Sequence, residues 1–70
     1  MNFSQALELI KKGHRLQRRE WNGKGMYIMQ LEALIGLEPF LVMKSAAAKT
    51  VPWVASQTDL LAEDWQLFVG

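Results

Sequence analysis

The sequence predicts an α+β fold in which an N-terminal helix packs on a small antiparallel sheet, with a second short helix near the C-terminus. Three observations support this prediction. Apolar residues follow a helical repeat at the start of the chain, and several short apolar runs are bounded by turn residues. The connections between these runs are too short for the crossovers of a parallel sheet. With 70 residues, the chain is expected to form one domain over residues 1–70.

The composition is apolar for so short a chain, since 50% of the residues are hydrophobic. A domain of this size buries only roughly 60% of the surface of its unfolded chain, so its core is marginal. The sequence contains no cysteine, which excludes disulfides and cysteine-based zinc sites. Because a monomer would leave apolar surface uncovered, we expect a homo-oligomer.

The charges nearly balance, with Lys+Arg 8 against Asp+Glu 7 and a formal net charge of +1. This balance provides no broad field for attracting DNA or an acidic membrane. The chain does not start with a signal-peptide pattern, and its longest nearly uncharged run, residues 25–31, is too short to span a bilayer. We therefore expect a soluble cytoplasmic protein that binds neither DNA nor membranes.

The most regular pattern lies at the N-terminus and predicts a helix over residues 3–12. Asn2 and Gln5 have the spacing of a capping box, in which each side chain accepts from the backbone N–H of the other residue. Gly13 provides the left-handed position that commonly follows a helix. The apolar residues of this segment lie on one helix face: Phe3, Ala6, Leu7 and Ile10.

Two strands are expected on either side of a turn. Residues 14–19 are typical of a short edge strand with a solubilising basic patch formed by Arg15, Arg18 and Arg19. Asn22 and Gly23 predict a turn. Residues 26–31 are apolar on both alternating faces and predict an inner strand, covered by the helix on one side and by a partner subunit on the other.

The second half of the chain predicts the rest of the sheet. Residues 31–38 favour either a helical turn or a loop. Residues 40–44 and 50–54 resemble paired strands, although the alanine-rich turn between them is unusual for a hairpin. Pro52 predicts that the second of these strands lies at a sheet edge or breaks there.

A second helix is expected to begin at Ser56, because Asp59 stands three residues later in another capping-box spacing. Apolar residues follow directly after this cap, and residues 65–69 alternate well enough to form the final strand. The start of this helix favours anions, but Ser56 and Asp59 are able to satisfy its N–H groups themselves.

The residues suited to catalysis do not form a working set. His14 is the single histidine, and without a second histidine or a cysteine the sequence lacks a nucleophile–base pair of that kind. Asp59, Glu63 and Asp64 are neighbouring carboxylates, but their spacing is more typical of a helix cap and a solvated helix face than of an acid–base pair. We therefore expect no enzymatic activity, no metal site and no cofactor.

Binding has better candidates, because tryptophans offer flat surfaces on which a nucleotide base can stack. Trp65 is flanked by apolar residues and is expected in the core. Trp21 and Trp53 lie next to turn or helix-start residues, so a structural role and a ligand-binding role stay equally open for both.

Polar groups near these tryptophans are candidates for the rest of a nucleotide. Asn22, Gly23 and Lys24 offer backbone N–H groups and one cation for a phosphate, although they are first of all a turn. The carboxylate of Asp59 or of Asp64 is able to accept hydrogen bonds from ribose hydroxyls.

Four motifs stand out in the chain: a short N-terminal helix ending K-K-G, then E-W-N-G-K-G-M-Y, then P-F-L-V-M-K, then V-P-W-V-A-S-Q-T-D-L-L-A-E-D-W. Together they resemble a small phage and bacterial domain family that includes anti-Thoeris sponge proteins. The resemblance covers nearly the whole chain, and the second and fourth motifs are specific in combination.

The resemblance implies an α+β homotetramer that binds glycocyclic ADP-ribose, the signal of the Thoeris immune system, and holds it without degrading it. Some family members also bind cyclic oligonucleotide signals at a second site. The implied pocket lies between subunits and uses residues of the two specific motifs. Carried over by motif, these residues are Trp21 and Asn22 from the first and Trp53, Ser56, Thr58 and Asp59 from the second.

The chain departs from the family pattern at two places. Residues 31–38 are short beside members that have a longer insertion there, which implies that a lid over the pocket is missing. Residues 46–48 are alanines where a polar turn containing glycine is expected.

The predicted function is sequestration of a nucleotide immune signal, which inhibits host anti-phage defence in the host cytoplasm. One alternative is a small adaptor that binds a protein through exposed tryptophans and has no small-molecule ligand. Another is a structural or regulatory oligomer without a ligand.

Overall fold

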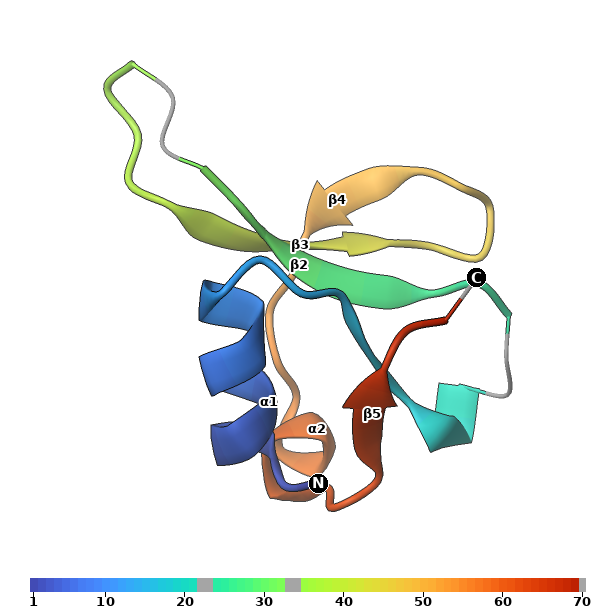
Figure 1. Cartoon of the computed structure of the whole chain (residues 1–70). Coiled ribbons are helices and arrows are strands. Elements are labelled where there is room, and N and C mark those ends of the chain that lie inside the picture. Colours follow the sequence, from blue (N-terminus) through green and yellow to red (C-terminus); the bar gives the residue numbers. More distant parts are fainter. Residues whose placement is uncertain (22–23, 33–34, 70) are drawn as a thin grey trace.

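A computed structural model of the protein describes residues 1–21, 24–32 and 35–69. The elements follow in the order α1 (Phe3–Lys11), β1 (Leu16–Arg18), the 3-10 helix η1 (Arg19–Trp21), β2 (Tyr27–Leu31), β3 (Phe40–Lys44), β4 (Thr50–Pro52), α2 (Gln57–Leu61) and β5 (Trp65–Leu67). The strands pair antiparallel in the order β4-β3-β2-β1-β5 (Figure 1). The predicted α+β fold is confirmed.

The N-terminal helix begins where its sequence predicts. The side chain of Asn2 accepts from the backbone N–H of Gln5, and the side chain of Gln5 accepts from the backbone N–H of Asn2. Lys12 is the C-cap, so the helix ends one residue earlier than expected. Gly13 follows with φ +97°, a left-handed conformation that glycine adopts without steric cost. The chain can therefore turn back toward the sheet directly after α1.

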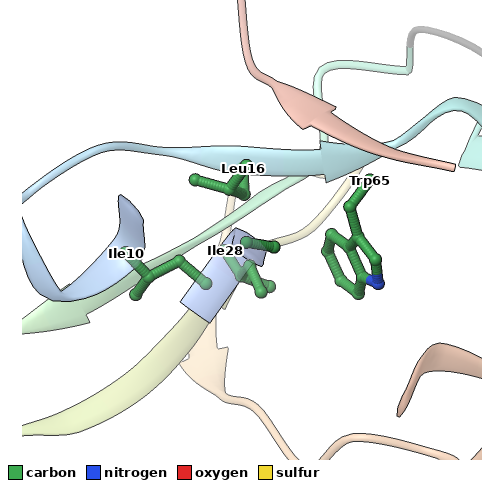
Figure 2. Close-up of a cluster of buried hydrophobic side chains, with 5 residues drawn as sticks. Ile10, Leu16, Ile28 and Trp65 are labelled. Atoms are coloured by element: carbon green, nitrogen blue, oxygen red, sulfur yellow. The ribbon is translucent and has the colours of Figure 1, made fainter. Parts of the chain in front are cut away.

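The core lies between α1 and the sheet, because α1 packs against β1, β2 and β5. Its fully buried side chains come from the helix and from these three strands, as Figure 2 shows for the labelled ones. The buried residues are Ala6, Ile10, Leu16, Ile28 and Trp65. Leu16 lies opposite Ile28 across the sheet, and residues directly opposite each other share a face, so the two strands contribute to the same core.

The prediction that residues 14–19 form an edge strand is wrong. β1 lies between β2 and β5, and Leu16 is fully buried. Because side chains alternate along a strand, Arg18 shares the core-facing side with Leu16 and does not guard an edge. The edges of the described sheet are β4 and β5, and Pro52 lies in β4, as expected for an edge strand.

The inner position predicted for residues 26–31 is confirmed, since β2 lies between β1 and β3. The connection from β2 to β3 is a hairpin loop that projects from the body of the molecule (Figure 1). Residues 33–34 of this connection lie outside the described residues. None of the helices that the structure describes has the length and apolar character needed to cross a bilayer.

The opposite face of the sheet is also apolar. Side chains that alternate with the core-facing ones point to this side, and they are Tyr27, Met29, Leu31, Phe40 and Val42. We name these five residues the open face. α1 packs on the other side of the sheet, and in the described part of the chain no helix covers the open face.

Candidate functional site

The three tryptophans gather into one aromatic cluster around Trp65. Trp65 is buried, with 1% of its surface exposed, so the prediction that it belongs to the core is confirmed. The ring of Trp21 lies edge-on to it at 5.5 Å between centroids, and the ring of Trp53 lies edge-on at 6.0 Å. Phe3 packs against Trp53 and Trp65 at 5.9 Å and 5.3 Å. Edge-to-face contacts at these distances are favourable, so the rings hold one another in place.

Trp21 and Trp53 are half-buried and pack against the core, while part of each ring system remains accessible. They come from η1 and from the segment between β4 and α2, which lie more than thirty residues apart in the sequence. The fold therefore brings the two motif segments together within one chain. Asn22 and Gly23 lie outside the described residues.

The orientation of Trp65 is fixed by a hydrogen bond from its Nε1 to the backbone carbonyl of Asp59, at 3.0 Å. This bond satisfies the only polar atom of a buried indole, which is the usual requirement for burying a tryptophan. Because Asp59 lies in α2, the bond also ties that helix to β5.

Arg18 lies opposite Trp65 in the pairing of β1 with β5, and the sequence did not reveal its role. Only 7% of its surface is exposed. Its Nε donates to Oδ1 of Asp64 at 2.9 Å, and its Nη1 donates to Oδ1 of Asp59 at 3.0 Å. Its Nη2 forms an ion pair with Oε2 of Glu20 at 2.7 Å. One guanidinium thus binds three carboxylates, one with each of its nitrogens.

Two of these carboxylates, those of Asp64 and Asp59, also use their remaining oxygen. Oδ2 of Asp64 accepts from the backbone N–H of Glu20 at 3.0 Å, and its backbone carbonyl accepts from the N–H of Arg19 at 3.1 Å. Oδ2 of Asp59 accepts from the backbone N–H of Ser56 at 3.3 Å. We name Arg18, Glu20, Asp59 and Asp64 the Arg18 network.

The electrostatics of the network follow from these contacts. Hydrogen bonding by Asp64 raises the pKa of Arg18, and burial of the guanidinium opposes this effect. Burial alone would raise the pKa of Asp64. The hydrogen bonds from Arg18 and from the backbone N–H of Glu20 outweigh it, so the pKa of Asp64 lies below its ordinary value.

The second helix is capped as its sequence predicts. The side chain of Ser56 accepts from the N–H of Asp59 at 3.0 Å, which completes a capping box. Both carboxylate oxygens of Asp59 therefore have partners, in Ser56 and in Arg18. Thr58 lies exposed in the first turn of α2. On the other segment, Lys24 is exposed and its backbone N–H donates to the carbonyl of Trp21 at 3.4 Å.

Neither a cavity nor a metal-binding cluster occurs among the described residues of the single chain. The tryptophans and the Arg18 network form one connected candidate site at the surface. Its exposed rim includes Glu20, Lys24, Ser56 and Thr58.

A second group of aromatic rings lies where the open face meets β5. Tyr27 and Phe68 pack with their centroids 4.6 Å apart. The guanidinium of Arg15 lies 5.1 Å and 5.3 Å from these two ring centroids, and Nζ of Lys44 lies 5.6 Å from that of Tyr27. Such cation–π contacts neutralise no charge, so this end of the open face is basic.

Comparison with known proteins gives two matches along nearly the whole chain. The model of the Tad2-like family, described as the Thoeris anti-defense 2-like domain, matches residues 1–68. A relative from Bacillus phage SP01, named Thoeris anti-defense 2, is 37% identical over 83 residues, which cover 96% of this chain and 93% of the relative. The aligned region is longer than the 70 residues of this chain, so the relative has residues without a counterpart here. Their placement at residues 31–38 stays a prediction.

Proposed function

The chain belongs to the Thoeris anti-defense 2-like family, and from this membership and the site described above we propose how it inhibits Thoeris defence. The protein binds a nucleotide immune signal, glycocyclic ADP-ribose, and sequesters it without chemical change. Cyclic oligonucleotide signals are a further ligand class for the same protein. Inhibition then depends on tight binding and slow release, and not on catalysis.

The observation that carries this proposal is the pair of half-buried tryptophans held edge-on against Trp65. A ring that is fixed before binding loses little conformational freedom when a base stacks on it, which favours affinity. Stacking on an aromatic ring contributes about 1–3 kcal/mol per base. We therefore assign the adenine to Trp21 or Trp53.

The remaining parts of the ligand fit the polar rim. Lys24, together with its sequence neighbours Asn22 and Gly23, is assigned to the phosphates, because Lys24 is an exposed cation close in sequence to Trp21. Ser56 and Thr58 are exposed hydroxyls at the start of α2 and, with Asp59 or Asn22, are assigned to ribose hydroxyls.

The pocket is proposed to close between subunits of a homo-oligomer, with a tetramer as the expected state. The open face supports self-association, because four of its five apolar side chains are only half-buried and no described helix packs on them. Light scattering coupled to size exclusion measures the assembly directly. Met29→Asp, on the open face, is expected to reduce the oligomer, whereas a change to aspartate at an exposed position of α1, Ser4→Asp, is expected to leave it intact.

The function is tested by retention of the signal. Purified protein is incubated with glycocyclic ADP-ribose, free ligand is removed by filtration, and the protein is denatured by heat. Intact signal in the supernatant after heating supports sequestration. A converted signal would show that the protein is an enzyme. If all the signal passes into the first filtrate, the proposal is wrong for this ligand, and the assay is repeated with cyclic trinucleotides.

The site assignment is tested in the same assay with Trp21→Ala and Trp53→Ala. Each is expected to abolish retention while the oligomer remains intact, because part of each ring is accessible and the buried hub is Trp65. Leu61→Ala serves as the control, since it removes a largely exposed apolar side chain that the site does not use. If both tryptophan variants unfold, these rings belong to the core and the assignment fails.

A further inference from the structure

Arg18 links its own part of the chain, β1 and η1, to residues 41 and 46 positions later in the sequence, in α2 and directly before β5. Through Glu20 it contacts η1, through Asp59 it contacts α2, and through Asp64 it contacts the residue that precedes β5. Two backbone hydrogen bonds from η1, given by the N–H groups of Arg19 and Glu20, run to Asp64 in parallel with these ion pairs. The network therefore fixes η1 relative to the start of β5.

A contribution to stability does not by itself account for the Arg18 network. A buried guanidinium loses its hydration, and an apolar side chain of similar volume is often at least as stabilising at such a position. A planar guanidinium with fixed donor directions instead specifies geometry, because each nitrogen must face its own carboxylate.

The contacts lead to the tryptophans on both sides. Glu20 directly precedes Trp21, so the ion pair with Arg18 restrains the turn that presents this ring. On the other side, Asp59 binds Arg18 with its carboxylate and Trp65 with its carbonyl. Trp21 and Trp53 both rest on Trp65, so the positions of the two accessible rings depend on contacts that begin at Arg18.

We propose that Arg18 is a positioning residue for the ligand site, which holds Trp21 and Trp53 in their binding arrangement before the ligand arrives. The effect of Arg18 on ligand affinity rests on the proposed function, whereas its effect on the arrangement of the tryptophans does not. Arg18 itself, being buried, makes no contact with the ligand.

The test compares Arg18→Lys with two controls. Lysine keeps the positive charge but cannot bind three carboxylates with a planar fork. Arg19→Lys makes the same chemical change at the neighbouring exposed arginine. Ile28→Val removes one buried methylene group from the core without touching the network, so it lowers stability by a purely structural route.

Two readouts are measured well below the unfolding temperature. The first is the near-ultraviolet circular dichroism of the ligand-free protein, which reports how rigidly the tryptophans are held. We expect Arg18→Lys to lose most of this signal, while Arg19→Lys and Ile28→Val keep it. The second is the dissociation rate of the retained signal, which we expect to rise roughly tenfold or more in Arg18→Lys alone, as for other losses of a supporting residue.

An unchanged tryptophan spectrum in Arg18→Lys, with stability lowered as in Ile28→Val, overturns the proposal. If wild-type protein retains no signal, the proposed function fails, and the spectrum still decides the positioning role. If Arg18→Lys does not fold, Asp64→Asn replaces it, because one amide oxygen cannot accept from both Arg18 and the N–H of Glu20. A wild-type spectrum in Asp64→Asn, together with an unchanged dissociation rate, then overturns the proposal.

Discussion

Replacing Trp65 by phenylalanine tests whether this residue is the hub of the aromatic cluster. The change removes the hydrogen bond from Nε1 to the carbonyl of Asp59, which contributes about 1 kcal/mol. This carbonyl also accepts from the N–H of Ala62 at 3.4 Å, so it is not left without a partner. The smaller ring also weakens the edge-on contacts with Trp21 and Trp53, at about 0.5–1.5 kcal/mol for each aromatic pair.

Together these losses amount to about 2–4 kcal/mol. A domain of 70 residues is stabilised by roughly 4–10 kcal/mol in total, so Trp65→Phe removes a large share. At about 4–8 °C per kcal/mol for a chain of this size, the midpoint of thermal unfolding falls by roughly 8–30 °C. Trp65→Ala costs at least ~3–5 kcal/mol and is expected to leave the protein largely unfolded at ambient temperature.

The assay is thermal unfolding followed by circular dichroism at one fixed protomer concentration, since oligomerisation makes the midpoint depend on concentration. Trp53→Phe is the matched control, because it makes the same change at a half-buried tryptophan. It is expected to cost under about 1.5 kcal/mol. Equal shifts for the two variants, or a larger shift for Trp53→Phe, would show that Trp65 does not organise the cluster.

Two further changes test the Arg18 network and the turn after β3. Because Arg18 and Glu20 hold the pKa of Asp64 below its ordinary value, the stability that Asp64 contributes is present above the unfolded pKa of about 3.9 and is lost as the pH falls through the lower folded value. Asp64→Asn is therefore expected to lower the free energy of unfolding by about 1.5–3 kcal/mol at pH 7. Urea unfolding measures this difference from wild type, which is expected to stay constant down to about pH 5 and to shrink below about pH 4. Ala48 has φ +62°, a conformation that costs a non-glycine residue about 1–2 kcal/mol. Glycine removes this cost but adds entropy to the unfolded chain, so Ala48→Gly is expected to raise the unfolding midpoint by roughly 2–4 °C. A lower midpoint would contradict this prediction.

The sequence predicted the parts of the fold that depend on neighbouring residues. Both capping boxes, at Asn2 and Ser56, require only residues three positions apart, and both form as predicted. Pro52 cannot donate to a sheet ladder, and it lies in an edge strand. Trp65 lies among apolar residues, and it is buried. In each of these cases the local chemistry leaves few alternatives.

The position of β1 could not be predicted, because it depends on pairing between distant segments. Arg15, Arg18 and Arg19 look alike in the sequence, yet they have three different surroundings. Arg15 stacks over Tyr27 and Phe68, Arg18 is buried among carboxylates, and Arg19 is exposed. The partners of Arg18 in α2 and before β5 are 41 and 46 residues away. One signal was available, since Arg18 stands two residues after Leu16, the one apolar residue of the strand, and so shares its face.

The distribution of charge in the site favours one of the two phosphate positions that the sequence left open. Arg18 faces two carboxylates on the α2 side, those of Asp59 and Asp64, so this side carries an excess of negative charge. The N–H of Asp59 is already bonded to Ser56, and a helix as short as α2 adds little dipole. A phosphate on this side would meet carboxylates at close range, whereas ribose hydroxyls can donate to them. We therefore propose that the phosphates of the ligand lie on the Lys24 side and that its ribose hydroxyls lie beside α2.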